Sequence, residues 1–277
     1  MRINKTIFPT GRRTAKIGPA AIRVALVFGL ILSSGGAVLP VASSAAAAVS
    51  YMATAPGDMP GWHRDFVDDF NAVSLNTVVW ARYMPGGRTR GNLSTQDPAN
   101  VYTSNGQLVL RTHQENGAWT SGGMSSGRGF TATQGKWTFR ARFDRAYGIG
   151  YVFLLYPGGG AWPPEVDIAE GTAGGPQVMS TLHWDTDNKR KSFFKTGVNM
   201  ALWHTYGVVM QGDTISFTID GVIWSTFTSP GVPKILMWFG LQAGAKDCAQ
   251  STNECTGSAT PIDSRIYVDW IAHWTAA

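Results

Sequence analysis

Runs of alternating or continuous apolar residues, separated by turn residues, constrain the fold of this chain most. In residues 136–144, KWTFRARFD, apolar side chains fall at every second position, and the same period recurs in 213–227 and 265–274. Residues 105–112 and 151–157 add two candidate strands, and the second is apolar on both faces, as expected of a central strand. No stretch keeps a helical period beyond two turns. The pattern predicts an all-β sandwich or barrel.

Strict alternation also predicts which side chains enter the core. In the first run these are Trp137, Phe139, Ala141 and Phe143. In 265–274 they are Ile266, Val268, Trp270 and Ala272. Asp220-Gly221 interrupts the run 213–227, and this two-residue turn signal predicts a hairpin.

The first 48 residues do not resemble part of a fold. They carry six basic residues and no acidic one, followed by the apolar run VALVFGLILSSGGAVLPVA and the small-residue run SSAAAAVS. This order is typical of a cleaved export signal, with cleavage options near Ala46 to Ala48. Polar and small residues and Pro40 interrupt the apolar run, so a retained membrane anchor is the weaker alternative. We expect residues 49–277 to form one secreted domain, without membrane contact after cleavage.

Removal of that segment changes the charge of the chain. The full chain has 23 basic and 18 acidic residues, and removing six basic residues leaves 17 against 18, a net charge of about −1. The basic balance therefore belongs to the export segment and predicts neither nucleic acid nor an anionic membrane as a partner. All 11 tryptophans follow residue 48, which indicates a large core together with ring surfaces for a ligand.

Cys248 and Cys255 are the two cysteines of the chain. An exported chain meets an oxidising compartment, so we expect a disulfide that closes this short loop. A zinc site is the weaker alternative, because it needs two further ligands and none has metal-site spacing. The closed loop is small, so the disulfide should contribute about 2 kcal/mol and stiffen one loop.

Three acidic residues lie close together in PPEVDIAEG, residues 163–171, without a Lys or Arg in the stretch. The prolines disfavour a helix, and β-branched residues alternate with Glu165 and Asp167, so the stretch is expected to be a strand. Strict alternation places Glu170 on the opposite face. A β-bulge around Ala169 would return Glu170 to the face of the other two acids.

Such a cluster has a specific chemical use. Crowded carboxylates raise at least one pKa, and a neutral acid beside an ionised carboxylate is the pair that cleaves glycosides. Retaining enzymes hold these groups about 5–5.5 Å apart, whereas the strand separates the outer two acids by ~13 Å of backbone, so their side chains must lean together. A calcium site and a solvated acidic strand are the alternatives.

The chain resembles glycoside hydrolase family 16 at this point. E-x-D-x-x-E on a strand is similar to that family's catalytic signature in its bulged, laminarinase-like form, whereas lichenase-type members lack the extra residue. Further segments that follow the family's order are 66–80, 98–112, 147–171, 203–221 and 267–274. The resemblance implies a concanavalin A-like β-jelly-roll sandwich of two antiparallel sheets with a concave substrate cleft.

The resemblance also implies roles for individual residues. Glu165 would be the nucleophile and Glu170 the general acid/base, with Asp167 between them controlling the nucleophile and its neighbour. His183 could hydrogen-bond Glu170 and tune it; a satisfied or exposed histidine is the alternative.

Other candidates are weaker. Trp162 and Trp184 could stack on sugar rings, with a core position equally open for either. Arg88 and Asn92, in GGRTRGN, could bind hydroxyl groups, with a solvated turn as the alternative. Asp269 stands where some relatives bind calcium, but we expect a structural aspartate and no required cofactor.

The implied function is that of a secreted, endo-acting, retaining β-glycanase that hydrolyses internal bonds of a polysaccharide, with β-1,3-glucan favoured. We expect a monomer. The alternatives are a non-catalytic, lectin-like sandwich, action on a galactan, and transglycosylation. Residues 183–195 are expected to form a loop whose basic cluster either contacts an acidic polysaccharide or is simply solvated.

Overall fold

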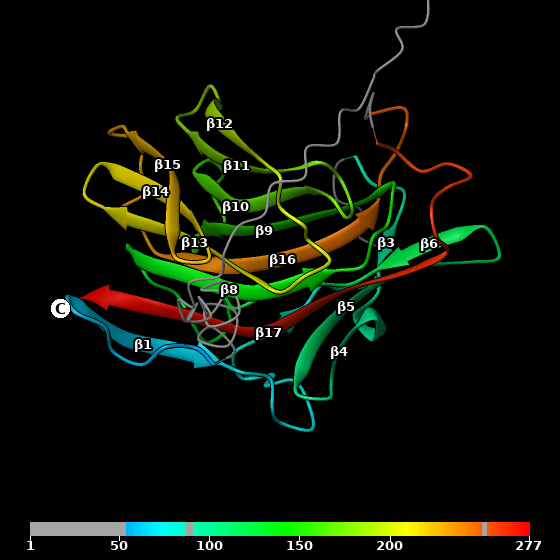
Figure 1. Cartoon of the computed structure of the whole chain (residues 1–277), viewed down its shortest axis with the longest axis horizontal. Helices are drawn as coiled ribbons and strands as arrows, with labels where there is room; N and C mark the ends of the chain where they lie inside the picture. Colours follow the sequence, from blue (N-terminus) through cyan, green and yellow to red (C-terminus); the bar gives the residue numbers. More distant parts are fainter. Residues whose placement is uncertain (1–53, 87–90, 251–253) are drawn as a thin grey trace, which may run out of the picture. The chain divides into compact units, whose positions relative to one another are not determined.

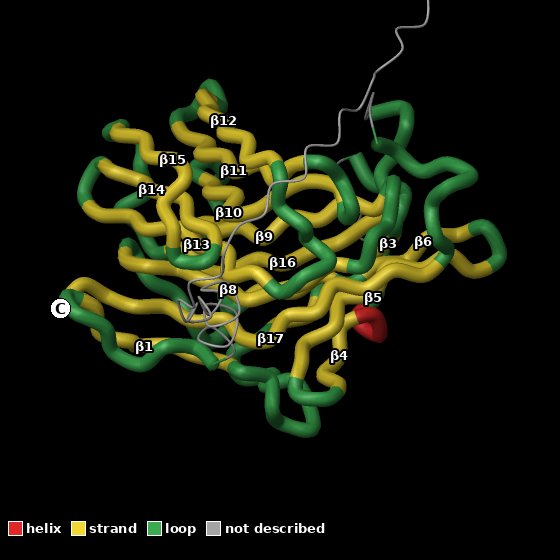
Figure 2. Tube along the Cα trace, in the orientation of Figure 1, coloured by secondary structure: helices red, strands yellow, loops and turns green. Residues whose placement is uncertain are grey.

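The computed structural model describes residues 54–86, 91–250 and 254–277 (Figure 1). The predicted export segment, residues 1–48, lies outside the described residues, as does Arg88. The described part consists of strands and loops with one short 3₁₀ helix, η1 (Pro98–Asn100) (Figure 2). None of its helices is long and apolar enough to cross a membrane.

The strands form two sheets. The order in the larger sheet is β15 (Val222–Thr228), β14 (Thr214–Ile219), β13 (His204–Gln211), β8 (Gly135–Phe143), β17 (Asp263–Ala276), β5 (Gln107–Glu115), β6 (Ala118–Ser121) and β3 (Thr95–Gln96). In addition, β1 (Trp62–Asp68) pairs with β17, and β4 (Val101–Ser104) pairs with β5. The order in the smaller sheet is β12 (Lys189–Thr196), β11 (Gln177–Trp184), β10 (Glu165–Thr172), β9 (Ile149–Pro157), β16 (Met237–Ala245), β7 (Gly123–Ser125) and β2 (Ala81–Arg82).

Pairing is antiparallel throughout except between the short strands β3 and β6. The all-β prediction is confirmed, and β9 is central, because it lies between β10 and β16. Asp220 and Gly221 both have positive φ, 52° and 77°, and form the predicted hairpin turn between β14 and β15.

The main core lies between the two sheets. The predicted core face of β8 is confirmed, because Trp137, Phe139, Ala141 and Phe143 all belong to the main cluster. Side chains of the two sheets meet there: the rings of Phe139 on β8 and Phe153 on β9 are 4.4 Å apart, edge to face. This packing leaves the other face of the smaller sheet for the candidate site.

The prediction for β17 is wrong beyond Val268. The pairing of β17 with β8 shifts between Val268 and Trp270, so alternation changes phase there. Ile271 therefore joins the main core. Trp270 and Ala272 instead pack in a second cluster, with Trp274.

Residues 183–195 are not a loop, contrary to the sequence-based expectation. They contain the end of β11, a turn and most of β12. β12 is the edge of the smaller sheet, where lysines are common because charge discourages pairing with another chain. The basic residues thus lie on an edge strand.

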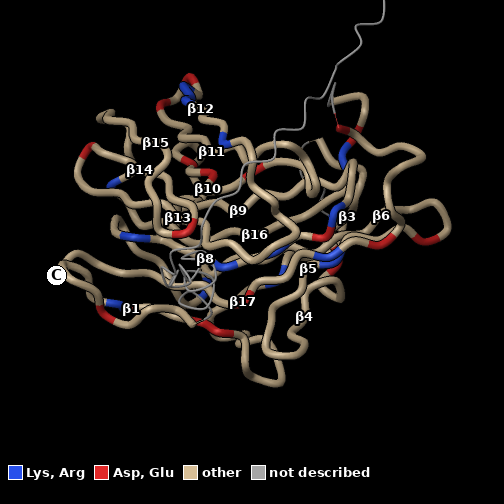
Figure 3. Tube along the Cα trace, viewed as in Figure 1, with Lys and Arg blue, Asp and Glu red and all other residues tan. Residues whose placement is uncertain are grey.

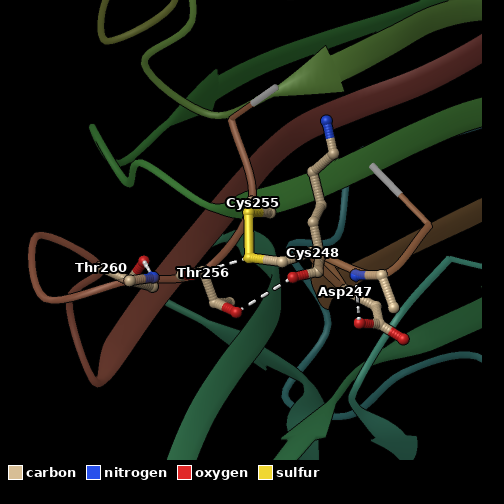
Figure 4. The surroundings of a disulfide bond; sticks show 8 residues. Asp247, Cys248, Cys255, Thr256 and Thr260 are labelled. Atoms are coloured by element: carbon tan, nitrogen blue, oxygen red, sulfur yellow. Dashed lines mark hydrogen bonds between the residues drawn. A yellow bond between two sulfur atoms is a disulfide. The ribbon is translucent and has the colours of Figure 1, made fainter. Parts of the chain in front are cut away.

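The predicted disulfide between Cys248 and Cys255 is present, with an S–S distance of 2.06 Å (Figure 4). Beside it, the Thr256 N–H and hydroxyl donate to the Lys246 carbonyl at 3.2 and 3.1 Å. The Asp247 N–H donates to the Gly91 carbonyl at 2.8 Å. The disulfide loop is therefore tied to the residue that follows β16 and, through Asp247, to Gly91.

Candidate active site

The three acids of β10 share one face of the smaller sheet. Across β11, Glu165, Asp167 and Glu170 lie opposite His183, Thr181 and Met179. These three β11 residues occupy alternate positions, so their side chains point to one face. The acids opposite them point to the same face, which we call the site face.

A β-bulge makes this arrangement possible. On the β9 side, Asp167 pairs with Leu154 and Ala169 pairs with Phe153, so Ile168 is the extra residue. Ile168 and Ala169 are both buried in the main core. Asp167 and Glu170 are three positions apart, so a regular strand would place them on opposite faces. Because two consecutive residues between them both point inward, the two acids point to the same face. The predicted bulge around Ala169 is confirmed.

The acids perturb one another. Asp167 is 2% exposed, and its pKa is raised well above the ordinary value, chiefly by burial and further by the charges of Glu170 and Glu165, against an opposing hydrogen bond from His183. The pKa of Glu170 is raised by burial and then by the charge of Glu165. The cluster therefore retains protons that isolated carboxyl groups would lose.

His183 contacts Asp167 rather than Glu170, which corrects the prediction for its partner. Its Nε2 lies 3.3 Å from Asp167 Oδ2, and its Nδ1 lies 2.8 Å from Asn188 Oδ1. The reason is the register, which places His183 opposite Glu165 at the far end of the acidic row from Glu170. The hydrogen bond to Asp167 raises the pKa of His183 to about 9. A doubly protonated ring can donate to both oxygen atoms.

The two candidate tryptophans lie on different faces. Trp162 is 44% exposed, its Nε1 donates to Glu165 Oε2 at 2.5 Å, and its ring lies 6.0 Å from that of His183. Trp184 follows His183 on β11 and points toward the main core, with its ring 5.9 Å from that of Phe227. Of the two possibilities left open for Trp184, stacking on a sugar ring or a core position, the structure shows the core position.

Sequence reasoning missed Tyr83 and Tyr156, whose pKa values are both raised by burial and then by the charge of Glu165, and Trp238, which packs against Tyr156. The rings of Tyr156 and Trp238 lie 5.1 Å apart. The pKa of Tyr83 is raised by burial first and then by the charges of Glu165 and Tyr156. Residues 151–157 are apolar on both faces, so their sequence does not show which side is outward. Tyr83 lies outside any periodic run and carries no local signal.

A pocket of about 350 Å³ adjoins Glu170. Its polar lining residues are Asn92, Glu170, Gln242, Lys246 and Gln250. Asn92 was a predicted contact, and it forms an isolated β-bridge with Lys246. Gln242, Lys246 and Gln250 were not predicted, because their approach to Glu170 depends on the pairing of β16 with β9 and on the disulfide loop.

Asp269, the candidate calcium ligand, forms an ion pair with Arg140. Its Oδ2 accepts a hydrogen bond from Arg140 Nη1 at 2.7 Å, so an arginine occupies the place of a cation. The described residues contain no group of three or more His, Cys, Asp or Glu side chains that could hold a metal ion. This geometry agrees with a structural aspartate, and calcium remains an untested prediction.

Comparison with known protein families decides the assignment. Residues 90–271 match the sequence profile of glycosyl hydrolases family 16. The chain belongs to this family. Membership places it among the glycoside hydrolases, and the profile covers the acidic cluster, the pocket and the disulfide loop.

Two curated relatives come from Rhizobium meliloti (strain 1021). Endo-1,3-1,4-beta-glycanase ExsH is 31% identical over 106 residues, which are 37% of this chain and 23% of that protein. Endo-1,3-1,4-beta-glycanase EglC is 30% identical over 105 residues, with the same two coverages. This chain thus spans about a quarter of the length of these relatives.

Solved structures of this family share the fold. The catalytic domain of an endo-1,3-beta-glucanase (laminarinase) from Thermotoga petrophila superposes with a TM-score of 0.68 at 17% identity, over 78% of this chain and 98% of that one. For endo-beta-1,3-glucanase from Pyrococcus furiosus the TM-score is 0.67 at 17% identity, over 78% and 95%. The predicted β-jelly-roll fold is confirmed.

Proposed function

We propose that this glycoside hydrolase is a secreted, endo-acting β-glycanase that cleaves internal bonds of a polysaccharide with retention, and that β-1,3-glucan is its favoured substrate. The observation that carries the proposal is the bulge, which directs Glu165, Asp167 and Glu170 to one face. The names of the family relatives, a laminarinase and endo-β-glycanases, support the substrate class.

Glu165 is the proposed nucleophile. The Trp162 N–H donates to its Oε2 at 2.5 Å and fixes the position of this carboxyl group. Its attack on the anomeric carbon breaks the glycosidic bond and forms a glycosyl ester. Water then hydrolyses this ester and regenerates Glu165, so the product keeps the β configuration.

Glu170 is the proposed general acid and base. Its raised pKa favours the protonated form that the first step requires. It gives this proton to the departing oxygen, and in the second step it accepts a proton from the attacking water. Between the two steps Glu165 is an uncharged ester. Its charge no longer raises the pKa of Glu170, so this pKa falls and Glu170 can act as the base.

Asp167 and His183 are proposed to position the nucleophile. Burial favours the neutral form of Asp167, and contact with Glu165 favours a proton on Asp167 as well. Asp167 keeps this proton and uses it to donate a hydrogen bond to the Glu165 carboxyl group. His183 fixes the other side of the Asp167 carboxyl group.

A panel of β-1,3-, mixed-linkage β-1,3-1,4- and β-1,4-glucans and galactans tests the proposal, with product sizes followed by chromatography. The wild type should shorten a β-1,3-glucan to oligosaccharides. Glu165→Gln should lose nearly all activity and still bind the polymer, and Glu170→Gln should lose about 10²–10⁴-fold. Glu115→Gln, at the exposed end of β5, is the matched control and should remain active.

Two outcomes would count against the proposal. Binding of the polymer without any cleavage by the wild type would favour a lectin-like sandwich. An α anomer as the first product, detected by NMR, would mean inversion and would remove Glu165 from the nucleophile role.

A further inference from the structure

We propose that the pocket beyond Glu170 binds a sugar residue that carries an anionic group, a carboxylate or a sulfate ester, with Lys246 as its counter-charge. This inference rests on the proposed function, because that function gives the pocket its place relative to the reacting bond. It goes further by assigning an anionic substituent to the β-1,3-linked sugar on the leaving-group side of that bond.

The pocket lies on the leaving-group side. Glu170 lines it, whereas Glu165 does not. In a retaining reaction the nucleophile approaches one face of the anomeric carbon and the acid protonates the oxygen that departs from the other. The departing sugar therefore lies on the Glu170 side, where the pocket of about 350 Å³ begins.

Lys246 is held in place at this pocket. Its side chain crosses Gly150 so closely that a Cβ there would lie 3.0 Å from Lys246 Cγ and 3.2 Å from its Cδ. Its Nζ donates to the hydroxyl of Thr172, which is only 1% exposed, at 2.9 Å. A lysine fixed by a glycine and a buried hydroxyl loses less side-chain entropy on binding a ligand than a freely moving surface lysine.

The charge of Lys246 has no ion-pair partner in the described part of the chain: none of the ion pairs found there includes it. An ammonium group has three donors, so two remain beyond the bond to Thr172. Glu170 is the one carboxylate among the described residues that line the pocket. Because Glu170 is protonated when it acts as the acid, Lys246 can then face an anion of the substrate.

The rest of the lining suits a sugar. Gln242 supplies an amide group that can bind hydroxyls, and Asn92 also lines the pocket. Gly244 lets Asn92 approach the sheet, since a Cβ at this glycine would lie 2.7 Å from Asn92 Cγ.

A second cation reinforces the charge. Arg190 on β12 lies opposite His183, and the charges of Lys246 and Arg190 both lower the pKa of Glu170. In Figure 3 the acidic positions of β10 and the basic positions of β12 lie on the two sides of β11, which pairs with both strands. An anionic polysaccharide would thus meet positive charge on both sides of Glu170.

The test compares a neutral β-1,3-gluco-oligosaccharide with carboxymethylated and sulfated forms of the same length. For the wild type, kcat/KM should be about tenfold higher for the anionic forms at low salt. Lys246→Met should lower the ratio of kcat/KM for the anionic form to kcat/KM for the neutral form about tenfold. Lys246→Arg should retain part of this preference. Lys234→Met is the matched control, because Lys234 is exposed and paired with Asp213; its ratio should equal that of the wild type. The carboxylated and sulfated arms distinguish the two kinds of anion.

The inference would be overturned if Lys246→Met lowered kcat/KM equally for the neutral and the anionic oligosaccharides. It would also be overturned if this variant shifted the pH profile without changing the ratio of the two kcat/KM values. In either case Lys246 would act only on Glu170. Calorimetric binding of the same oligosaccharides to Glu165→Gln, with and without Lys246→Met, decides the preference even if no substrate is cleaved. Failure of the proposed function is thereby separated from failure of this inference. Equal affinity for neutral and anionic forms would again overturn it.

Discussion

At the scale of single residues, Asn188 determines how His183 meets the acidic cluster. Asn188 Oδ1 accepts from His183 Nδ1, so that Nε2 faces Asp167. Asn188 has a φ of 51°, a left-handed conformation that glycine adopts without strain. Asn188→Gly therefore removes the side chain while keeping the backbone of the turn.

We expect Asn188→Gly to lower the pKa of His183 from about 9, because one of the two hydrogen bonds that favour the imidazolium is lost. A raised histidine pKa contributes stability that is complete below pH ~6.5 and is lost as pH rises through about 9. In the variant this loss should fall at lower pH and be smaller. NMR titration of the imidazole and chemical denaturation between pH 6 and 10 measure the two effects.

Asn116→Gly is the matched control, since Asn116 has a φ of 50° in the turn between β5 and β6, away from the site. It should leave the titration of His183 unchanged. An unaltered His183 titration in Asn188→Gly would show that Asn188 does not support the ring.

Sequence could predict the acidic trio and could name Trp162 and His183 as site residues, but it could not identify the partners from distant segments. Glu165, Asp167 and Glu170 lie within six positions, and one local bulge relates them. Tyr83 and Lys246 come from distant segments. Their proximity depends on long-range pairing, of which single residues carry no signal.

At the scale of elements, the bulge of β10 can be tested by deletion. Deletion of Ile168 changes the spacing of Asp167 and Glu170 from three to two, so regular alternation alone keeps both on the site face. Residues after Glu170 also keep their orientation. We expect a folded protein, less stable by about 2–5 kcal/mol from the loss of a buried side chain, that still hydrolyses the substrate better than Glu165→Gln. A deletion variant that folds but has no activity would contradict the argument that regular alternation keeps Asp167 and Glu170 on the site face.

The disulfide loop is a second element with a measurable role. Replacing Cys248 and Cys255 by serine should cost about 2–2.5 kcal/mol for so short a loop. The loop holds Gln250 and is hydrogen-bonded to Lys246, so KM should rise more than kcat falls. Denaturation curves and steady-state kinetics test both parts. An unchanged KM would mean that the loop does not shape the pocket.

Bulges also explain where element-level prediction succeeded and failed. In β10 the chemistry of clustered acids required an extra residue, so the bulge could be predicted. In β17 no such requirement exists, and the phase change between Val268 and Trp270 depends on pairing with β8. Residues 270–274 of β17 are buried on both faces of the strand, so apolar character alone could not reveal the shift.

At the scale of the whole molecule, alternation predicted the fold class because each sheet buries one face against the other. The order of strands could not be derived in this way. The long-range pairs β17 with β5 and β16 with β9 bring together segments far apart in sequence.

The export prediction applies to the whole chain as well. We expect the protein recovered outside the cell to begin between residues 47 and 49, after loss of the basic segment, and N-terminal sequencing determines this directly. Recovery of the intact chain from the membrane fraction would instead support the retained anchor.

The disulfide between Cys248 and Cys255, next to Lys246, affects when the enzyme reaches full activity. Inside a cytosol rich in thiols, Cys248 and Cys255 remain apart, and one wall of the sugar pocket is held by hydrogen bonds alone. For the exported protein proposed above, oxidation after transit would complete that wall. The producing cell would thus carry a weaker catalyst within its own boundary than the one it delivers to its surroundings.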